Sequence, residues 1–226
     1  MADIPAAGAT FPDLADPERA LAITYAPAAA RPGLAALFAL DERLGTIVGT
    51  TTEPMIGLMR LAWWREALER LDHGPVPAEP LMAALAEHVL SHGVTGADLS
   101  QIEDGWTALL DDEDVVTRHG RERGANLFRI AGRVLGDADA RFPAAGEGWA
   151  LADLAHRHSD PAIRQAARER AGAVLGGMSG GAWAKAGRVL GALAVLARRD
   201  VAEDAPRRQG SPGRLARMLA LRLTGR

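Results

Sequence analysis

The chain has 226 residues, of which 48% are hydrophobic and 24% are charged, with a formal net charge of -3 and no cysteine. A composition this apolar excludes an intrinsically disordered chain, and the lack of cysteine excludes disulfides, thiolate metal sites, iron–sulfur clusters and a cysteine nucleophile. The nearly balanced charge argues against a dedicated nucleic-acid binder, so we expect no nucleic-acid partner.

Helix-forming residue types dominate the composition. Ala, Leu, Arg and Glu are plentiful, whereas Val, Ile, Thr and the aromatic residues are sparse. Because the depleted types are those that favour strands, the sequence predicts an all-α fold. We expect a loose Ala-, Gly- and Pro-rich segment at residues 1–15, followed by one helical domain at residues 16–226. No secretory signal and no apolar run of the roughly 20 residues needed to span a membrane is present, so we expect a cytoplasmic protein.

Caps, prolines and apolar spacing predict a bundle of about 8–10 helices. Asp16 is the expected cap of the first one, with Pro17 in its first turn. The predicted helices cover residues 16–26, 32–48, 52–71, 80–91, 97–110, 115–135, 146–158, 161–175, 181–199 and 212–223.

The helix at residues 52–71 has the clearest pattern. Ile56, Met59, Trp63 and Ala67 recur at helical spacing and predict one apolar face. Trp63 and its neighbour Trp64 point about 100° apart on a helix, so both are buried only if the helix is covered on two sides. This predicts a helix deep in the bundle or lining a pocket, with core packing favoured over ligand contact.

Clusters of possible metal ligands have simpler explanations. The four acids at residues 111–114 lack the spacing of a calcium loop and are typical of a solvated loop. His88 and His92 have i,i+4 spacing but no third ligand, and His119 has no nearby partner in the sequence. We therefore expect no metal site and no catalytic residue among them. The glycine-rich stretch at residues 176–181 is typical of a flexible turn.

Several motifs in the first half of the chain form a family pattern. They are Pro27, Leu-Phe-Ala-Leu at residues 37–40, Ile47-Val48 and, most specifically, Leu-Ala-Trp-Trp-Arg-Glu-Ala-Leu at residues 61–68. Asp104-Gly105 and residues 124–131 continue the pattern more weakly. On these residues the chain resembles the squalene/phytoene synthase family. The resemblance implies the isoprenoid-synthase fold, a helical bundle around a deep central cavity.

The residues that carry the family's chemistry are altered here. Family enzymes join two prenyl diphosphates, and two acidic motifs on facing helices hold Mg²⁺ against the diphosphate. The first motif falls on Gly45, Thr46 and Gly49, where all three carboxylates are gone. The second falls on Asp153 to Arg157, where an arginine replaces the terminal aspartate. Acids also stand at Asp16, Glu18 and Glu42, in place of phosphate-contacting serines and an arginine.

These changes imply a degenerate member that has lost Mg²⁺-dependent prenyl transfer. It resembles the branch of the family linked to respiratory complex I assembly. We expect no cofactor, and either a hydrophobic isoprenoid-like ligand or a protein partner. The candidate pocket residues are Phe38, Asp41, Glu42, Trp63, Trp64 and Arg65.

Two alternatives remain open at this point. The first is an active prenyl-diphosphate transferase whose Mg²⁺ is held by other acids. The second is an unrelated helical protein, in which the helices at residues 32–48 and 146–158 would not face each other across a cavity.

The end of the chain is basic and amphipathic. It has no acid after Asp204, and it carries Arg207, Arg208, Arg214, Arg217, Arg222 and Arg226. Leu215, Met218, Leu219 and Leu223 form an apolar stripe, which is compatible with a peripheral membrane contact. An ordinary terminal helix packed on the bundle is the favoured interpretation.

Overall fold

The computed structural model describes residues 14–203 and 208–226, and every regular element in these two ranges is a helix. The predicted all-α fold is confirmed. The expected loose segment lies outside the described residues up to residue 13, as does Arg207.

Local sequence features start the helices as expected. Asp16 caps α1 (Pro17–Ile23), and its Oδ1 accepts hydrogen bonds from the backbone N–H groups of Glu18 at 2.8 Å and Arg19 at 3.4 Å. Proline stands in the first turn of several helices, where its missing N–H removes no helical hydrogen bond. The other helices predicted with close bounds are α2 (Arg31–Thr50), α3 (Pro54–Glu69), α4 (Pro80–His88), α5 (Gly96–Asp111), α9 (Pro161–Gly177) and α11 (Pro212–Thr224).

Three predicted helices differ from the structure in their bounds. The helix predicted at residues 115–135 consists of α6 (Val115–Arg118), a π-helical segment (His119–Ala125) and α7 (Asn126–Leu135). Helix α8 (Phe142–Arg157) begins four residues before its predicted start, because Pro143 opens the helix and does not break it. Helix α10 (Arg188–Ala202) begins seven residues late, because the N–H of Trp183 is bound at 2.8 Å by the carbonyl oxygen of Gly225.

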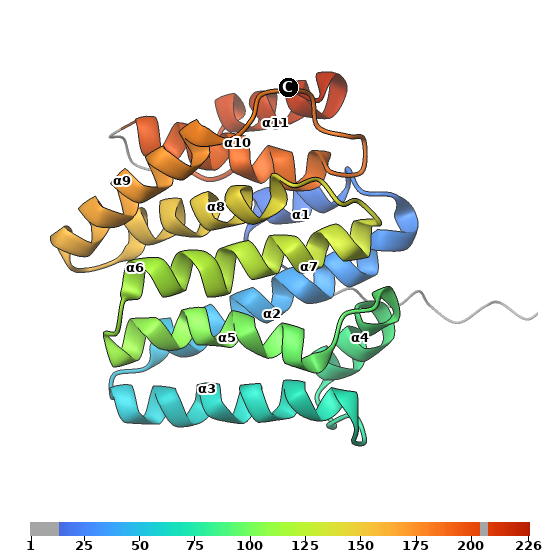
Figure 1. Ribbon diagram of the computed structural model, residues 1–226, viewed down its shortest axis with the longest axis vertical. Helices are drawn as coiled ribbons and strands as arrows, with labels where there is room; N and C mark the ends of the chain where they lie inside the picture. The colour runs from blue at the N-terminus through green and yellow to red at the C-terminus, as the bar shows by residue number, and fades with distance from the viewer. Residues whose placement is uncertain (1–13, 204–207) are drawn as a thin grey trace, which may run out of the picture.

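The helices stack along the long axis of the molecule, with α3 at one end and α11 at the other (Figure 1). Between them, the π-helical segment and α8 pack backbone against backbone. A Cβ atom added to Gly124 would lie 2.2 Å from the carbonyl oxygen of Gly146, and one added to Gly146 would lie 2.1 Å from the carbonyl oxygen of Gly124. Only glycine permits this approach, which draws the π-helical segment into the centre of the bundle.

The prediction of a buried apolar face on α3 is wrong for most of its residues. Ala67 is buried, but Ile56, Met59 and Trp63 are exposed, at 49%, 69% and 45%. The buried face carries Leu61, Trp64 and Leu68 instead. The reason is tertiary: α3 lies at the end of the bundle and packs on α2 and α5 with one side only. The two-sided cover expected for Trp63 and Trp64 is therefore absent, and their rings meet edge to face at 5.5 Å.

Candidate functional site

A buried arginine links the two helices on which the sequence-based prediction placed the acidic motifs. Arg123, on the π-helical segment, donates from Nε to Oδ1 of Asp41 on α2 at 2.7 Å, and from Nη2 to Oδ2 at 3.0 Å. Its Nη1 donates to Oδ2 of Asp153 on α8 at 3.2 Å. All three side chains are buried. Arg19, Asp41, His119, Arg123 and Asp153 form what we call the central ionic cluster.

Each oxygen of the Asp41 carboxylate accepts two hydrogen bonds. Oδ1 also accepts a hydrogen bond from Nε1 of Trp106 at 2.9 Å, and Oδ2 also accepts one from Nη1 of Arg19 at 3.0 Å. Burial by itself would raise the pKa of Asp41. The charges of Arg123 and Arg19 and the hydrogen bonds outweigh burial, so the pKa lies below its usual range. Asp41 is therefore a fixed anion that neutralises the buried arginines.

Aromatic rings enclose the two guanidinium groups. The guanidinium carbon of Arg123 lies 4.1 Å from the ring centre of Trp106 and 4.8 Å from that of Trp149. That of Arg19 lies 4.9 Å from the ring centre of Trp149, and Phe38 meets Trp149 edge to face at 6.3 Å. Cation–π contacts of this kind are stronger where water is excluded. Side chains thus fill the space between α2 and α8, where the resemblance implied a cavity.

His119 holds Arg123 in place as a neutral imidazole. Burial and the charge of Arg123 lower the pKa of His119 to about 3. Its Nδ1–H donates to the carbonyl oxygen of Gly105 at 2.8 Å, which leaves Nε2 to accept from Nη1 of Arg123 at 2.8 Å. His119 was expected to have no nearby partner, but its partner is four residues along the chain.

The predicted first motif carries no carboxylate and does not reach the central ionic cluster. Gly45 lies against Trp106, since an added Cβ would be 2.8 Å from the indole ring. Thr46 and Gly49 are exposed, and the Thr46 hydroxyl donates to the carbonyl oxygen of Glu42 on its own helix. In the second motif, Nε of Arg157 donates to Oδ1 of Asp153 at 2.8 Å, with the Arg157 side chain 66% exposed.

The candidate pocket residues divide into two groups. Phe38 and Asp41 lie in or against the central ionic cluster, and Glu42 borders it, with Oε1 3.5 Å from Nη1 of Arg19. Trp63, Trp64 and Arg65 lie elsewhere, on α3. Arg65 pairs there with two acids of α5, Glu103 at 2.6 Å and Asp104 at 3.2 Å.

The sequence-based prediction missed most members of the cluster. Arg19, His119 and Arg123 were not among the candidate site residues, and neither were Trp106 and Trp149, whose rings enclose the guanidinium groups. One pattern could have indicated two of them: His119 and Arg123 are four residues apart, so they share a helix face, with Gly120 and Gly124 beside them.

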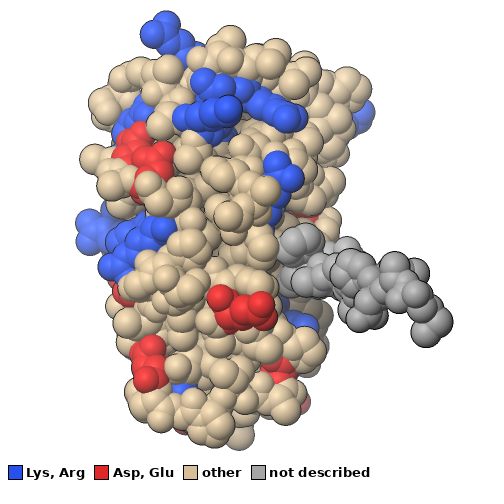
Figure 2. All heavy atoms as spheres, turned by 90° about the vertical axis from the view of Figure 1, so that its right-hand side faces the viewer, with Lys and Arg blue, Asp and Glu red and all other residues tan. Residues whose placement is uncertain are grey.

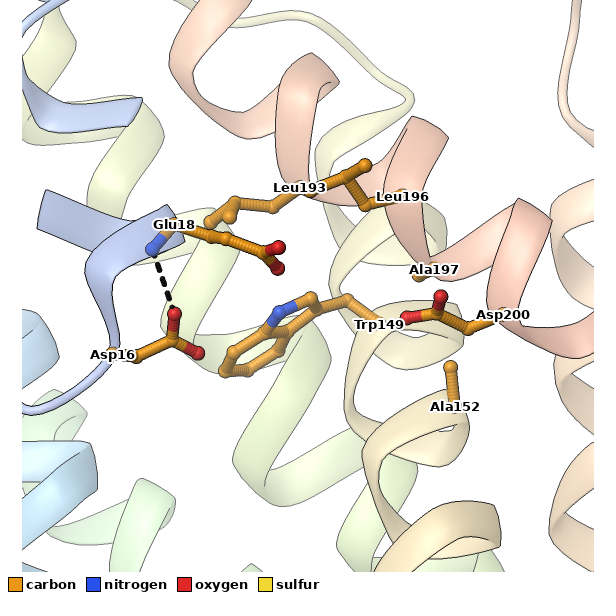
Figure 3. A pocket seen from close by; sticks show the side chains of 8 residues that line it. All are labelled: Asp16, Glu18, Trp149, Ala152, Leu193, Leu196, Ala197 and Asp200. Atoms are coloured by element: carbon orange, nitrogen blue, oxygen red, sulfur yellow. Dashed lines mark hydrogen bonds between the residues drawn. The ribbon is translucent and has the colours of Figure 1, made fainter. Parts of the chain in front are cut away.

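An enclosed pocket beside the cluster is small. Glu18 of α1, Trp149 of α8 and Asp200 of α10 point into it (Figure 3), and its volume is about 10 Å³. Such a volume holds about one water molecule, so an isoprenoid chain does not fit there. The two acids bind Arg214 of α11, whose Nε lies 2.6 Å from Oε1 of Glu18 and whose Nη2 lies 3.1 Å from Oδ2 of Asp200.

The residues present do not fit a Mg²⁺–diphosphate complex. Within residues 14–203 and 208–226, no three His, Asp or Glu side chains are grouped so that they could hold a metal ion. The oxygens of Asp41 and Asp153 face guanidinium groups, and a metal cation there would meet the charge of Arg123. In the same two ranges, no helix has the length and apolar character to cross a membrane.

Comparisons with known proteins agree with this arrangement of helices. The family model described as squalene/phytoene synthase matches residues 13–211. An 87-residue stretch is 32% identical to "NADH dehydrogenase (ubiquinone) complex I, assembly factor 6" of Rattus norvegicus and 31% identical to that of Homo sapiens. It covers 38% of this chain and 26% of each relative, so the match spans about a quarter of their length. No solved structure matches the chain. The alternative of an unrelated helical protein is wrong, because the chain belongs to the squalene/phytoene synthase family.

Proposed function

We propose that this family member does not carry out Mg²⁺-dependent prenyl transfer and acts instead as an assembly or scaffold protein that binds a protein partner. The observation that carries the proposal is the position of the Arg123 guanidinium, buried between Asp41 and Asp153.

The arrangement of charges supports the loss of the family reaction. Mg²⁺ binds carboxylate oxygens, and the metal neutralises the diphosphate as it leaves. Gly45, Thr46 and Gly49 supply no carboxylate. Removing one partner of a buried ion pair costs about 3–5 kcal/mol, so the cluster does not open readily to admit a substrate.

Two observations favour a protein partner over an isoprenoid ligand. The relatives matched over part of the chain are called assembly factors. The α3 surface, formed by Met55, Ile56, Met59 and Trp63, exposes four large apolar side chains. Contiguous exposed apolar patches mark interaction sites, and Met and Trp are enriched at the centres of protein interfaces. The exposed charges of Glu53, just before the helix, and of Arg60 and Glu66 within it have both signs, as at the polar rim of such interfaces.

An activity assay tests the loss of catalysis. The protein is incubated with farnesyl or geranylgeranyl diphosphate and Mg²⁺, and diphosphate release is compared with a blank and with an active family enzyme. We expect release at the level of the blank. The double variant Thr46→Asp, Gly49→Asp introduces carboxylates at two exposed positions. We expect its diphosphate release to equal that of the blank as well, because Arg123 remains in place. Release above the blank by the wild type contradicts the proposal and supports the alternative of an active transferase.

A co-purification experiment tests the partner. The tagged full chain is cross-linked in cells, purified from a detergent-solubilised extract and analysed by mass spectrometry. Met59→Glu with Trp63→Glu is the α3 variant, and Leu219→Glu with Leu223→Glu is the control at the other end of the molecule. We expect one protein recovered in near-stoichiometric amount with the wild type and the control and lost with the α3 variant. Equal recovery with all three contradicts the assignment to α3.

A further inference from the structure

The outward side of α11 is apolar, although it faces solvent. The helix turns Arg214, Met218 and Leu221 toward the bundle. At 3.6 residues per turn, the opposite side carries Ala216, Leu219, Ala220 and Leu223. Leu219 is 49% exposed and Leu223 is 71% exposed. A surface helix normally presents polar residues on its solvent side, so this apolar face is suited to contact with a binding partner.

Buried contacts fix the orientation of this face. The Arg214 side chain is bound by Glu18 of α1 and Asp200 of α10, and all three are buried. Met218, in the predicted apolar stripe, is fully buried, whereas Leu215, Leu219 and Leu223 of that stripe remain exposed. The helix therefore packs on the bundle and also leaves a row of apolar side chains exposed to solvent. Rotation that hides the row would break the buried ion pairs, so the row is a permanent feature of the surface.

Positive charge borders the apolar row on both sides. Arg217 and Arg222 lie on its two flanks at helical spacing, and Arg208 and Arg226 are exposed before and after the helix. Residues 208–226 contain no Asp or Glu. Figure 2 shows basic side chains gathered at the end of the long axis where α11 lies in Figure 1. A partner complementary to this surface is apolar in the middle and anionic at its surface.

We propose that α11 docks on the surface of an anionic lipid bilayer. Leu219 and Leu223 enter the boundary between headgroups and acyl chains, and Arg217 and Arg222 extend to the lipid phosphate groups, as in interfacial amphipathic helices. The uniform positive charge distinguishes this surface from the α3 surface, which has charges of both signs around it. The two surfaces lie at opposite ends of the molecule (Figure 1), so the bilayer and a protein partner can be bound together. The inference does not depend on the loss of catalysis.

Vesicle co-sedimentation with the full chain tests the inference. The protein is mixed with vesicles of phosphatidylcholine alone or of phosphatidylcholine with phosphatidylglycerol, at low and high salt. We expect binding to the anionic vesicles only, weakened by salt. Leu219→Glu with Leu223→Glu lowers the partition coefficient at least about tenfold. Arg217→Ser with Arg222→Ser lowers it about fivefold for each arginine.

The matched control carries the same kind of change at the other end of the molecule. Met55→Glu with Met59→Glu adds two acids to exposed side chains of α3, and we expect its binding to equal that of the wild type. Unchanged circular-dichroism melting shows that the variants fold. Equal binding to neutral and anionic vesicles, binding retained by the leucine variant, or binding lost by the α3 control overturns the proposal. The proposal is also overturned if the chain binds no vesicles and captures a protein through Leu219 and Leu223 instead.

Discussion

Arg123 and Asp41, 82 positions apart in the chain, form a bidentate ion pair at the centre of the bundle, with N–O distances of 2.7 Å and 3.0 Å. The pair joins the π-helical segment to α2, and both side chains are buried. Asp153 of α8 extends it to a third element. The carboxylates of Asp41 and Asp153 are thus both held by the guanidinium group of Arg123.

Replacing Arg123 tests how much this ion pair contributes to the stability of the fold. Arg123→Met leaves Asp41 buried with less compensation, so we expect the free energy of unfolding to fall by about 3–5 kcal/mol. The measurement is urea unfolding followed by circular dichroism. Arg157→Met is the control, since Arg157 binds the same Asp153 from an exposed position and its loss costs about 0–1 kcal/mol. Equal losses for the two variants would mean that the central pair contributes no more than a surface one.

Gly45 and Gly49 of α2 respond oppositely to replacement by alanine. Gly45→Ala places a methyl group against the ring of Trp106, which is held by Asp41 and Arg123, so we expect a loss of about 1–3 kcal/mol. Gly49→Ala meets open space near the end of α2 and gains up to about 1 kcal/mol from helix propensity. Thermal and urea unfolding of both variants give the values. Stabilisation by Gly45→Ala would show that Trp106 moves freely.

His119 makes stability depend on pH. Its pKa is about 3 in the folded chain, against 6.5 for the free side chain. Below pH 6.5 the unfolded chain takes up a proton that the folded chain does not. The free energy of unfolding therefore falls as pH falls, by up to about 1.4 kcal/mol per pH unit. Urea unfolding between about pH 6.5 and 5 measures this slope before carboxylates contribute.

Two variants test whether His119 causes this pH dependence of the free energy of unfolding. His119→Gln retains an amide that can donate to Gly105 and accept from Arg123, and we expect a flatter dependence whatever its overall stability. His92→Gln alters an exposed side chain and keeps the wild-type slope. A wild-type slope in His119→Gln would show that another group takes up the proton.

The two faces of α3 differ in their tolerance of polar residues. Met59 is 69% exposed, so Met59→Ser changes the free energy of unfolding by no more than about 0.5 kcal/mol. Leu61 is fully buried, and Leu61→Ser leaves a cavity and a buried hydroxyl, at a cost of about 3 kcal/mol or more. Urea unfolding separates the two outcomes. Similar losses would mean that something covers the α3 surface in the isolated protein.

Local chemistry explains where prediction from the sequence succeeded. Asp16, the prolines of the first turns and the spacing of Leu34, Leu37 and Leu44 act within a few residues, so the helices and the buried side of α2 were predictable. The absence of carboxylates at Gly45, Thr46 and Gly49 could also be read directly from the sequence. Ile56, Met59 and Trp63 were assigned to the wrong environment, because helical spacing identifies an apolar face without indicating what covers it.

The amino-acid sequence alone was enough to identify an all-α member of the squalene/phytoene synthase family, since helix propensity and motif identity are local properties. That Arg19 and Arg123 fill the space between α2 and α8 follows from the three-dimensional fold alone. Their partners lie 22 and 82 positions away, and a buried charge is stable only where the fold brings its counter-charge to it. The same holds for the outward row of α11, because the pairing of Arg214 with Glu18 and Asp200 sets which side of that helix meets the solvent.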